Sequence, residues 1–438
     1  MKKPESPPSL EKNILEDNTI QFLLKEDFLT SLYKIERENY PYWEELKYRT
    51  KKWPYPSKKI WSFLKHQRKF SQQTLDFSHH PGFTFHLNVP GLLQKYLHEL
   101  DMNLGGFLEG NIIPSQDKNR YLISSIMEEA ISSSQLEGAA TTRKVAKEML
   151  EKQRPPKDKS EKMILNNFKT MQWIVDNKNI KLTPEILLSI HKTITNGTLH
   201  NSLSEGEFRI NNDVKVMDET NEIFYIPPDY KIISNLLDEF FKLANHEIEI
   251  EFVHPIIKGI ILHFLIGYIH PFADGNGRTA RAIFYWYLIS KGYWLIEYMS
   301  ISRIILRAPV QYAQAYLHTE YDDNDLTYFI LYNIKALHVA LHDLKKYIYQ
   351  KTEERKKTIS LLKSGSYNER QVVIIKDVLQ NPDDFFTVKQ IETRFGINNQ
   401  TARNDLMNLQ KKGILQLRMT GNKAQFFAAD NFEKNLKF

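Results

Sequence analysis

The chain has 438 residues, of which 42% are hydrophobic, and a formal net charge of +6. This length and hydrophobic content are enough for two or three domains with cores of their own. The sequence contains no cysteine, which excludes disulfides, thiol nucleophiles and zinc–thiolate sites. So small a net charge, spread over the whole chain, does not by itself indicate a nucleic-acid partner.

The sequence predicts neither a secretory signal nor a membrane span. Residues 1–13 are polar and proline-rich, without the apolar stretch that a signal peptide requires. The longest apolar run, 256–269, contains Lys258 and His263. It is too short to cross a bilayer and predicts a buried helix. We therefore expect a soluble, cytoplasmic protein that does not associate with a membrane.

Residues 1–119 are expected to form a helical, aromatic-rich N-terminal extension. Tryptophan, tyrosine, phenylalanine and basic residues are concentrated over residues 36–100. Ile60, Phe63 and Leu64 have helical spacing and share one face. The composition favours a helical domain with an aromatic core. A nucleic-acid surface made from the same aromatic and basic side chains is the alternative interpretation.

Residues 120–160 predict two helices and a connector. The first helix is expected to end at Gly138 and the second to begin at Thr142, with a connector over 154–162. Ser133 and Glu137 are four positions apart, so they lie on one face of the first helix. Taken alone, Glu137 is an ordinary surface glutamate before a helix-ending glycine.

Residues 161–345 predict helices with one interruption, at 206–230. Val214 and Val216 alternate with polar residues there, and a second apolar stretch follows a polar turn. That stretch consists of Ile223, Phe224, Tyr225 and Ile226. Because Pro227-Pro228 stops the strand pattern, the segment predicts a short β-hairpin.

The segment from His270 to Arg281, HPFADGNGRTAR, places reactive groups between two apolar runs. Pro271 predicts that the preceding helix ends at His270. Gly275 and Gly277 permit a tight turn, and the next helix is expected from residue 278. Since the first N–H groups of a helix have no partner within it and its dipole favours negative charge there, the loop predicts a phosphate-binding site.

The side chains of the same segment suit phosphate chemistry. Arg278 and Arg281 are three positions apart and share a helix face near the anion site. Asp274 offers a hard oxygen ligand for Mg²⁺ bound to phosphates. The imidazole of His270 titrates near neutral pH and suits removal of a proton from a hydroxyl. A merely structural helix–loop–helix has no need of this combination, which favours nucleotide binding with His270 as general base.

This segment resembles the Fic family motif, H-x-F-x-D-G-N-G-R-x-x-R, at every defined position. The resemblance covers residues 120–345, with the preceding apolar helix and a hairpin ending FYIPP that is similar to the family's flap. It implies a mainly α-helical fold: a Fic-type helical core over 161–345 with a small β-hairpin flap, preceded by the helical N-terminal extension. Residues 346–369, which are charged and then Ser/Gly-rich, predict a linker to a C-terminal winged helix.

Fic enzymes mostly transfer AMP from ATP to a Ser, Thr or Tyr hydroxyl of a protein. The resemblance therefore implies AMPylation of a protein substrate, the chain itself included. His270 would be the catalytic base, Asp274 the Mg²⁺ ligand and Phe272 the anchor of the loop. The nucleotide-binding residues would be Gly275, Asn276, Gly277, Arg278, Thr279, Ala280 and Arg281. Tyr225 and Tyr312 are further candidate neighbours of the nucleotide, and the hairpin would dock the target by strand addition.

The string SSQLEG, which contains Ser133 and Glu137, resembles the inhibitory motif of Fic proteins, [S/T]-x-x-x-E-[G/N]. The resemblance implies a bidentate pair between Glu137 and Arg281 where the γ-phosphate would bind, so that ATP binds unproductively. Three alternatives remain open. The same glutamate could orient a water for AMP removal, the donor could be another nucleotide, or the Fic core could only sense nucleotide in a DNA-binding regulator. His270 argues against the last, because sensing needs no base.

Residues 370–438 predict a winged helix: helices, a helix-turn-helix and a hairpin that turns at Gly421-Asn422. The segment holds 11 Lys and Arg against 7 Asp and Glu. Candidate DNA contacts begin the recognition helix or lie on the wing. They are Asn398, Asn399, Gln400, Arg403 and Asn404, followed by Arg418 and Lys423. DNA, another protein and a second copy of the chain in a homodimer remain alternative partners.

Overall fold

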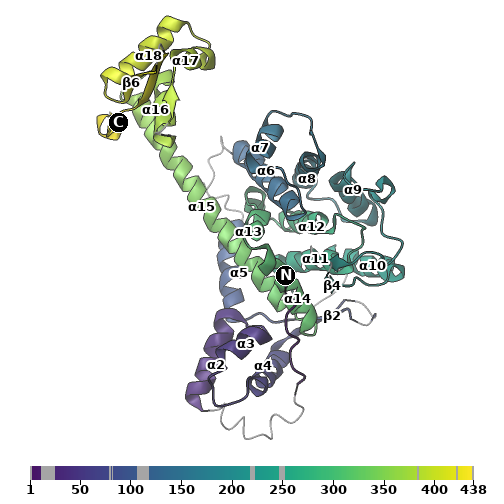
Figure 1. The fold of residues 1–438 in the computed structure, drawn as a ribbon. Helices are drawn as coiled ribbons and strands as arrows, with labels where there is room; N and C mark the ends of the chain where they lie inside the picture. Colours follow the sequence, from purple (N-terminus) through teal and green to yellow (C-terminus); the bar gives the residue numbers. More distant parts are fainter. Residues whose placement is uncertain are drawn as a thin grey trace. The chain divides into compact units, whose positions relative to one another are not determined.

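The computed structural model describes residues 2–10, 25–77, 80, 82–105, 118–217, 222–245, 252–381, 384–420 and 423–436. The chain divides into two compact units, Met1–Leu344 and Lys345–Phe438. Both are mainly helical, as expected, and the strands form small sheets (Figure 1). No helix in the described part of the chain is both long and apolar enough to cross a membrane.

The N-terminal extension is helical, with one small antiparallel sheet. Its elements are α2 (Glu26–Asn39), α3 (Trp43–Arg49), α4 (Ser57–Ser71), β1 (Gln73–Asp76), β2 (Thr84–Leu87) and α5 (Gly91–Leu104). Trp43 and Trp61 are buried and meet edge to face, so aromatic side chains form a core here as predicted. Lys65 of α4 donates to Asp322 at 2.8 Å, and both side chains are buried. This ion pair ties the extension to the rest of the unit.

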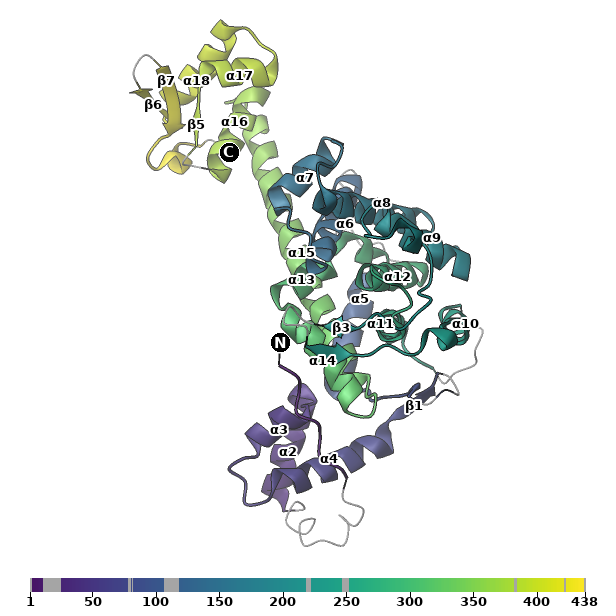
Figure 2. The ribbon, with the colours of Figure 1, turned by 45° about the vertical axis from the view of Figure 1, so that its right-hand side comes forward.

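The centre of the first unit is built from helices α6 to α14. They are α6 (Lys118–Leu136), α7 (Arg143–Glu151), α8 (Lys159–Asp176), α9 (Pro184–Thr195), α10 (Ile233–Ala244), α11 (Pro255–Ile269), α12 (Asn276–Ser290), α13 (Ile301–Arg307) and α14 (Pro309–Tyr321). Figure 1 and Figure 2 show α11 and α12 side by side, and most of their side chains are buried. A helix that is apolar all round belongs in a core. A Cβ at Gly259 would stand 3.1 Å from Leu288 of α12, so this glycine allows close packing.

Local sequence signals set the ends of the helices that carry the site. α6 is followed by Gly138 at φ +90°, and Thr142 caps α7 with its side chain, both as predicted. α11 ends before His270, which is left-handed at φ +51°. This end agrees with the prediction from Pro271. α12 begins at Asn276, two residues before the expected start.

The interruption predicted at 206–230 contains the expected antiparallel hairpin, in a shorter form. It consists of β3 (Val216–Met217) and β4 (Ile223–Tyr225), with Val216 opposite Tyr225 and a register shift after that pair. Val214 and Ile226 lie outside the strands. The tip of the hairpin, 218–221, lies outside the described residues. We call the described parts of 206–226 the flap.

The long helix α15 (Thr327–Lys363) belongs to the first unit at its start and to the second at its end. Most of the predicted linker, 346–363, is therefore helical. The linker is predicted from charged residues followed by a Ser/Gly-rich stretch, and a solvated helix can be equally rich in charged residues. The helix ends before the Ser-Gly-Ser stretch at 364–366, where Gly365 is left-handed at φ +64°.

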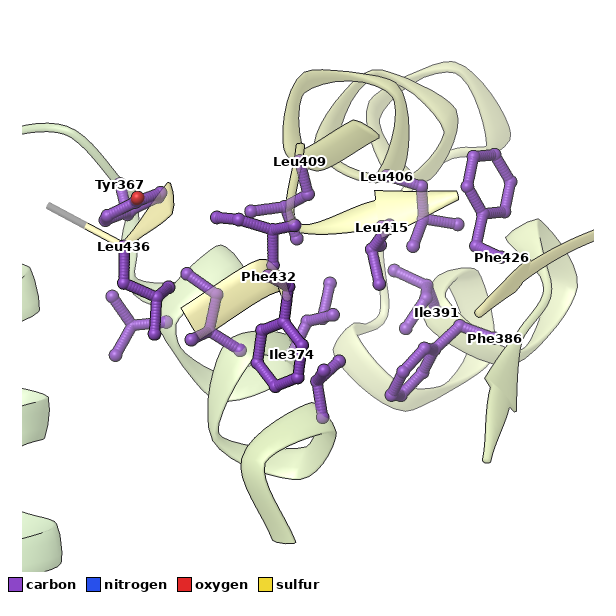
Figure 3. Close-up of a cluster of buried hydrophobic side chains, with 14 of the residues drawn as sticks. Tyr367, Ile374, Phe386, Ile391, Leu406, Leu409, Leu415, Phe426, Phe432 and Leu436 are labelled. Atoms are coloured by element: carbon purple, nitrogen blue, oxygen red, sulfur yellow. The ribbon is translucent and has the colours of Figure 1, made fainter. Parts of the chain in front are cut away.

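The second unit has the element order of a winged helix. Its elements are α16 (Glu369–Gln380), β5 (Phe385–Phe386), α17 (Val388–Phe395), α18 (Asn399–Lys411), β6 (Leu415–Thr420) and β7 (Lys423–Ala428). The strands pair in the order β5-β7-β6, and β5 is an addition to the predicted elements. The expected turn at 421–422 lies outside the described residues. Figure 3 shows the apolar side chains of this core, among them Ile374, Leu406 and Phe426, all buried.

Candidate active site

His270 stands at the C-terminal end of α11, where the chain turns into the motif loop. Its Nδ1 lies 3.2 Å from the carbonyl of Gly267. Because a carbonyl only accepts, Nδ1 carries the hydrogen and Nε2 keeps its lone pair. Burial lowers the pKa of His270 below its ordinary value. A neutral imidazole with a free Nε2 lone pair is the form that a general base requires.

The loop after His270 is held by side chains that point inward. Phe272 is fully buried and stacks on His191 of α9, with ring centroids 3.7 Å apart. Asn276 bonds to the main chain of Phe272 at both ends of its amide: Oδ1 accepts the N–H at 3.0 Å and Nδ2 donates to the carbonyl at 2.8 Å. The expected anchor and the expected nucleotide ligand Asn276 therefore shape the loop together.

His191 supports the same loop through both of its ring nitrogens, a role that the sequence did not reveal. Its Nε2 donates to the carbonyl of Asp274 at 2.8 Å, and its Nδ1 accepts the N–H of Gly206 at 3.0 Å. Burial lowers the pKa of His191 to about 4, so the ring stays neutral and keeps one tautomer. The partners are 83 and 15 positions away in the chain, a separation that no local pattern encodes.

The sequence predicts an anion site at the start of α12. Gly275 is left-handed at φ +85°, and a Cβ there would stand 2.8 Å from Thr195. The first N–H groups of α12 have no partner within the helix and point toward the loop. Thr279 and Ala280 are fully buried, so their side chains belong to the core.

Two buried arginines follow on α12. Arg278 is 2% exposed, and its Nε atom has no hydrogen-bond partner among the described residues. Burial lowers the pKa of Arg278 below its ordinary value. Its Nη2 lies 3.8 Å from Oδ1 of Asp274, a carboxylate whose side chain is 58% exposed. A buried guanidinium with an open donor is suited to an anionic ligand.

The structure brings Glu137 to Arg281, as the resemblance implied, across 144 positions of sequence. Nη2 of Arg281 donates to Oε1 of Glu137 at 2.9 Å, while Nε donates to the hydroxyl of Ser133 at 2.8 Å. The guanidinium is thus shared, and the bidentate pair that we expected is not formed. Burial alone would lower the pKa of Arg281, but the neighbouring carboxylate of Glu137 raises it above its ordinary value.

Glu137 also lies directly on the start of α12. A Cβ built on Gly277 would stand 2.2 Å from Oε1 of Glu137, closer than two such atoms can approach. Any residue other than glycine at 277 would therefore displace the carboxylate. The glutamate occupies the space in front of the helix terminus and of Arg281, where a phosphate would be attracted.

Arg209 fastens the flap to the motif loop, a second role that the sequence did not reveal. Its Nε donates to the carbonyl of His270 at 2.9 Å and its backbone N–H to the carbonyl of Pro271 at 2.9 Å. Its Nη atoms bond to the carbonyls of Asn211 and Pro228. One side chain thus joins residues before β3 and after β4 to the residue expected to be the base.

Tyr225 and Tyr312 lie close to the site in different ways. The hydroxyl of Tyr225 donates to the carbonyl of Tyr268 at 2.8 Å, which holds β4 against α11. The hydroxyl of Tyr312 lies 2.8 Å from Nε2 of His263 and close to Arg281. Tyr225 therefore supports the flap. Tyr312 borders the arginine that a nucleotide would meet.

A profile of the Fic/DOC family matches residues 181–288, and a profile of the DeoR-like helix-turn-helix domain matches residues 370–422. The protein adenylyltransferase Fic of Drosophila erecta is 29% identical over 119 residues, which are 26% of this chain and 21% of that protein. The protein of the same name from Culex quinquefasciatus is 31% identical over 120 residues, 27% of this chain and 21% of the relative. The matched part thus spans about a fifth of these relatives.

Among solved structures, a Fic family protein from Desulfovibrio desulfuricans G20 aligns with a TM-score of 0.49 at 16% identity, covering 77% of this chain and 95% of that one. The matched profile spans His191, Arg209 and the whole motif from His270 to Arg281. Residues 181–288 of this chain are a Fic/DOC family domain, and residues 370–422 are a DeoR-like helix-turn-helix domain.

Proposed function

We propose that the chain transfers AMP from ATP to a hydroxyl of a protein, and that Glu137 keeps it in a resting state. The position of Glu137 carries the proposal: its carboxylate lies against Gly277 at the start of α12 and is bonded to Arg281. A helix terminus beside two buried arginines attracts phosphate. A carboxylate in that place competes with phosphate for the same donors.

The surrounding residues fit a nucleoside triphosphate with Mg²⁺. The open Nε donor of Arg278 would meet a phosphate oxygen. The exposed carboxylate of Asp274 lies beside the same helix start and would hold Mg²⁺ together with the phosphates, since this ion prefers carboxylate and phosphate oxygens. When bound, the ion would neutralise part of the phosphate charge. The adenylyltransferase names of the insect relatives support ATP as the donor.

His270 would accept the proton of the target hydroxyl at Nε2, because its Nδ1 hydrogen is engaged with Gly267. The hydroxyl oxygen would form a bond to the α-phosphorus as the bond from that phosphorus to the pyrophosphate oxygen breaks. Arg278 would stabilise the negative charge that grows on the leaving pyrophosphate. The exposed edge of the flap would hold the target backbone by strand addition. Positioning and electrostatics would supply most of the rate enhancement.

The decisive experiment is intact-mass analysis after incubation with ATP and Mg²⁺. The wild type should gain little mass, whereas Glu137→Gly should gain AMP, and Glu137→Gly with His270→Ala should gain none. Glu128→Gln is the matched control, because Glu128 lies on α6, the helix that ends just before Glu137, but pairs with Arg143. It should behave as the wild type does. Equal AMP incorporation by wild type and Glu137→Gly would refute inhibition by Glu137, and absence of AMP from both would refute the transfer reaction.

For the second unit we propose nucleic acid as the ligand. The DeoR-like match over 370–422 supports this choice over a protein partner. Four polar residues at the start of α18 are exposed: Asn399, Gln400, Arg403 and Asn404. In helix-turn-helix domains the start of the second helix of the motif reaches base edges and phosphates.

A further inference from the structure

Three side chains outside the Fic site converge on one point between α5 and α15. Glu99 lies on α5, and His338 and His342 lie one turn apart on α15. Within the described part of the chain, this group offers three ligand atoms that all lie within 4.8 Å of one another. Histidines four positions apart on a helix face the same way, so both Nε2 atoms reach the carboxylate.

The distances match the first coordination shell of a small metal ion. Nε2 of His338 lies 2.8 Å from one oxygen of Glu99, and Nε2 of His342 lies 3.3 Å from the other. The two Nε2 atoms are 3.1 Å apart. Tetrahedral Zn²⁺ with bonds of about 2.0–2.1 Å has ligand atoms roughly 3.3 Å from one another. A cation would therefore fit with small side-chain rotations.

The ligand types select the class of ion. Two imidazoles and one carboxylate suit Zn²⁺ and the neighbouring divalent transition metals, whereas Mg²⁺ and Ca²⁺ prefer oxygen ligands throughout. The Nε2 atom of each histidine faces the other Nε2 as well as an oxygen of Glu99. A metal ion accepts both lone pairs at once.

The surroundings orient the ligands and leave one side open. The ring of His338 packs against Tyr96 of α5, with centroids 4.8 Å apart. His338 is 23% exposed and His342 54% exposed, so solvent reaches the group. Three protein ligands beside solvent leave a position for water in a tetrahedral shell.

We propose that Glu99, His338 and His342 bind a divalent transition-metal ion, Zn²⁺ or a close relative, that links α5 to α15. The bound ion would hold α15 in place just before the boundary of the first unit at Leu344. This site shares no residue with the Fic motif. It predicts a metal requirement distinct from the Mg²⁺ that accompanies ATP.

The test uses the full chain without an affinity tag, stripped of metal by a chelator and titrated with Zn²⁺ in a calorimeter. The wild type should bind one equivalent with micromolar or tighter affinity and resist displacement by excess Mg²⁺. His338→Ala with His342→Ala should lose this equivalent, and Glu99→Gln should weaken it at least tenfold. His200→Ala, at an exposed histidine elsewhere, should bind as the wild type does.

Two further measurements distinguish loss of the metal site from loss of folding. Thermal unfolding without metal should be similar for wild type and variants, and Zn²⁺ should raise Tm by a few degrees in the wild type only. Co²⁺ should give the visible absorption of a four-coordinate ion, lost in the double variant. Binding that persists in the double variant, or a wild type that binds no Zn²⁺, would overturn the proposal.

Discussion

Arg281 is hydrogen-bonded to Ser133 as well as to Glu137, so we expect it to keep its orientation when the glutamate is removed. Ser133 accepts from Nε through its hydroxyl and from Nη2 through its backbone carbonyl at 3.0 Å. Loss of the Glu137 side chain would therefore vacate the anion site while the guanidinium remains buried and directed into it. The buried cation would then lack its counter-charge, a costly state that phosphate can relieve. Removal of the Glu137 side chain is therefore expected to raise the rate of AMP transfer and to leave the site folded.

The pH dependence of transfer follows from the environment of His270. Burial lowers its pKa, and the nearby negative charge of Glu137 acts against this. In Glu137→Gly the pKa should therefore fall further. Because the neutral ring is the base, the transfer rate should rise with pH through this lowered pKa and then level off. The half-maximal pH should lie below about 6.5, the ordinary histidine value.

The measurement is the initial rate of AMP incorporation by Glu137→Gly at saturating ATP and Mg²⁺ between mildly acidic and neutral pH. Thermal unfolding of the same variant across this range provides the control for acid destabilisation. A half-maximum above pH 7, with the protein folded throughout, would contradict a buried and neutral His270 as the base.

At the scale of elements, Arg209 is the side chain that joins the flap to the motif loop. Arg209 joins the flap to the carbonyl of His270 through a planar group with several donors. Arg209→Lys keeps the charge but cannot span these acceptors. Losing these partly buried hydrogen bonds should cost roughly 1 kcal/mol locally. We expect faster amide exchange over 206–226 and a raised KM for a protein target.

Lys215→Ala is the matched control for Arg209→Lys. Lys215 lies in the same segment, but its side chain is exposed, so its removal should leave exchange and KM close to the wild-type values. Amide exchange measured by mass spectrometry resolves the flap from the rest of the chain. Unchanged flap protection in Arg209→Lys would show that other contacts, such as the Tyr225 bond to Tyr268, hold the flap.

The elements differ in how far the sequence could predict them. Ends set by local chemistry, at Gly138 and before Pro271, were predicted and agree with the structure. The two-residue strand β5 carries too little periodicity to be found, and it exists because Phe385 and Phe386 pair with β7. Likewise, the motif indicates candidate reactive residues within itself, whereas His191 and Arg209 act through contacts over 83 and 61 positions of sequence. A single sequence does not record such contacts.

At the scale of the whole molecule, the chain combines two units that match different domain families. The Fic/DOC domain lies in the first, and the DeoR-like domain lies in the second, after the end of α15. The buried pair of Lys65 and Asp322 joins the N-terminal extension to the first unit, so the extension and the Fic core should unfold together. The second unit has a separate core (Figure 3). Substitutions on its surface should therefore leave the transfer reaction intact.

Substitution of Arg403 tests whether the second unit binds DNA independently of the transfer reaction. Arg403 is an exposed cation on α18, near the start of the helix that we propose to contact nucleic acid. Arg403→Ala should weaken binding to duplex DNA, measured by fluorescence anisotropy over a range of salt concentrations. If Arg403 contacts a phosphate, the slope of log affinity against log salt should fall by about one, because one fewer counterion is released. Placed in the Glu137→Gly background, the same substitution should leave AMP incorporation unchanged.

The control is Lys411→Ala, which removes the same charge from the far end of α18, where Lys411 is also exposed. Because the start of this helix is the part expected to reach DNA, the control should lower affinity less and change the salt slope little. Equal effects of both substitutions would indicate a general electrostatic attraction in place of a docked helix. A wild type without measurable DNA affinity at low salt would exclude nucleic acid, and the exposed start of α18 would then be assigned to a protein partner.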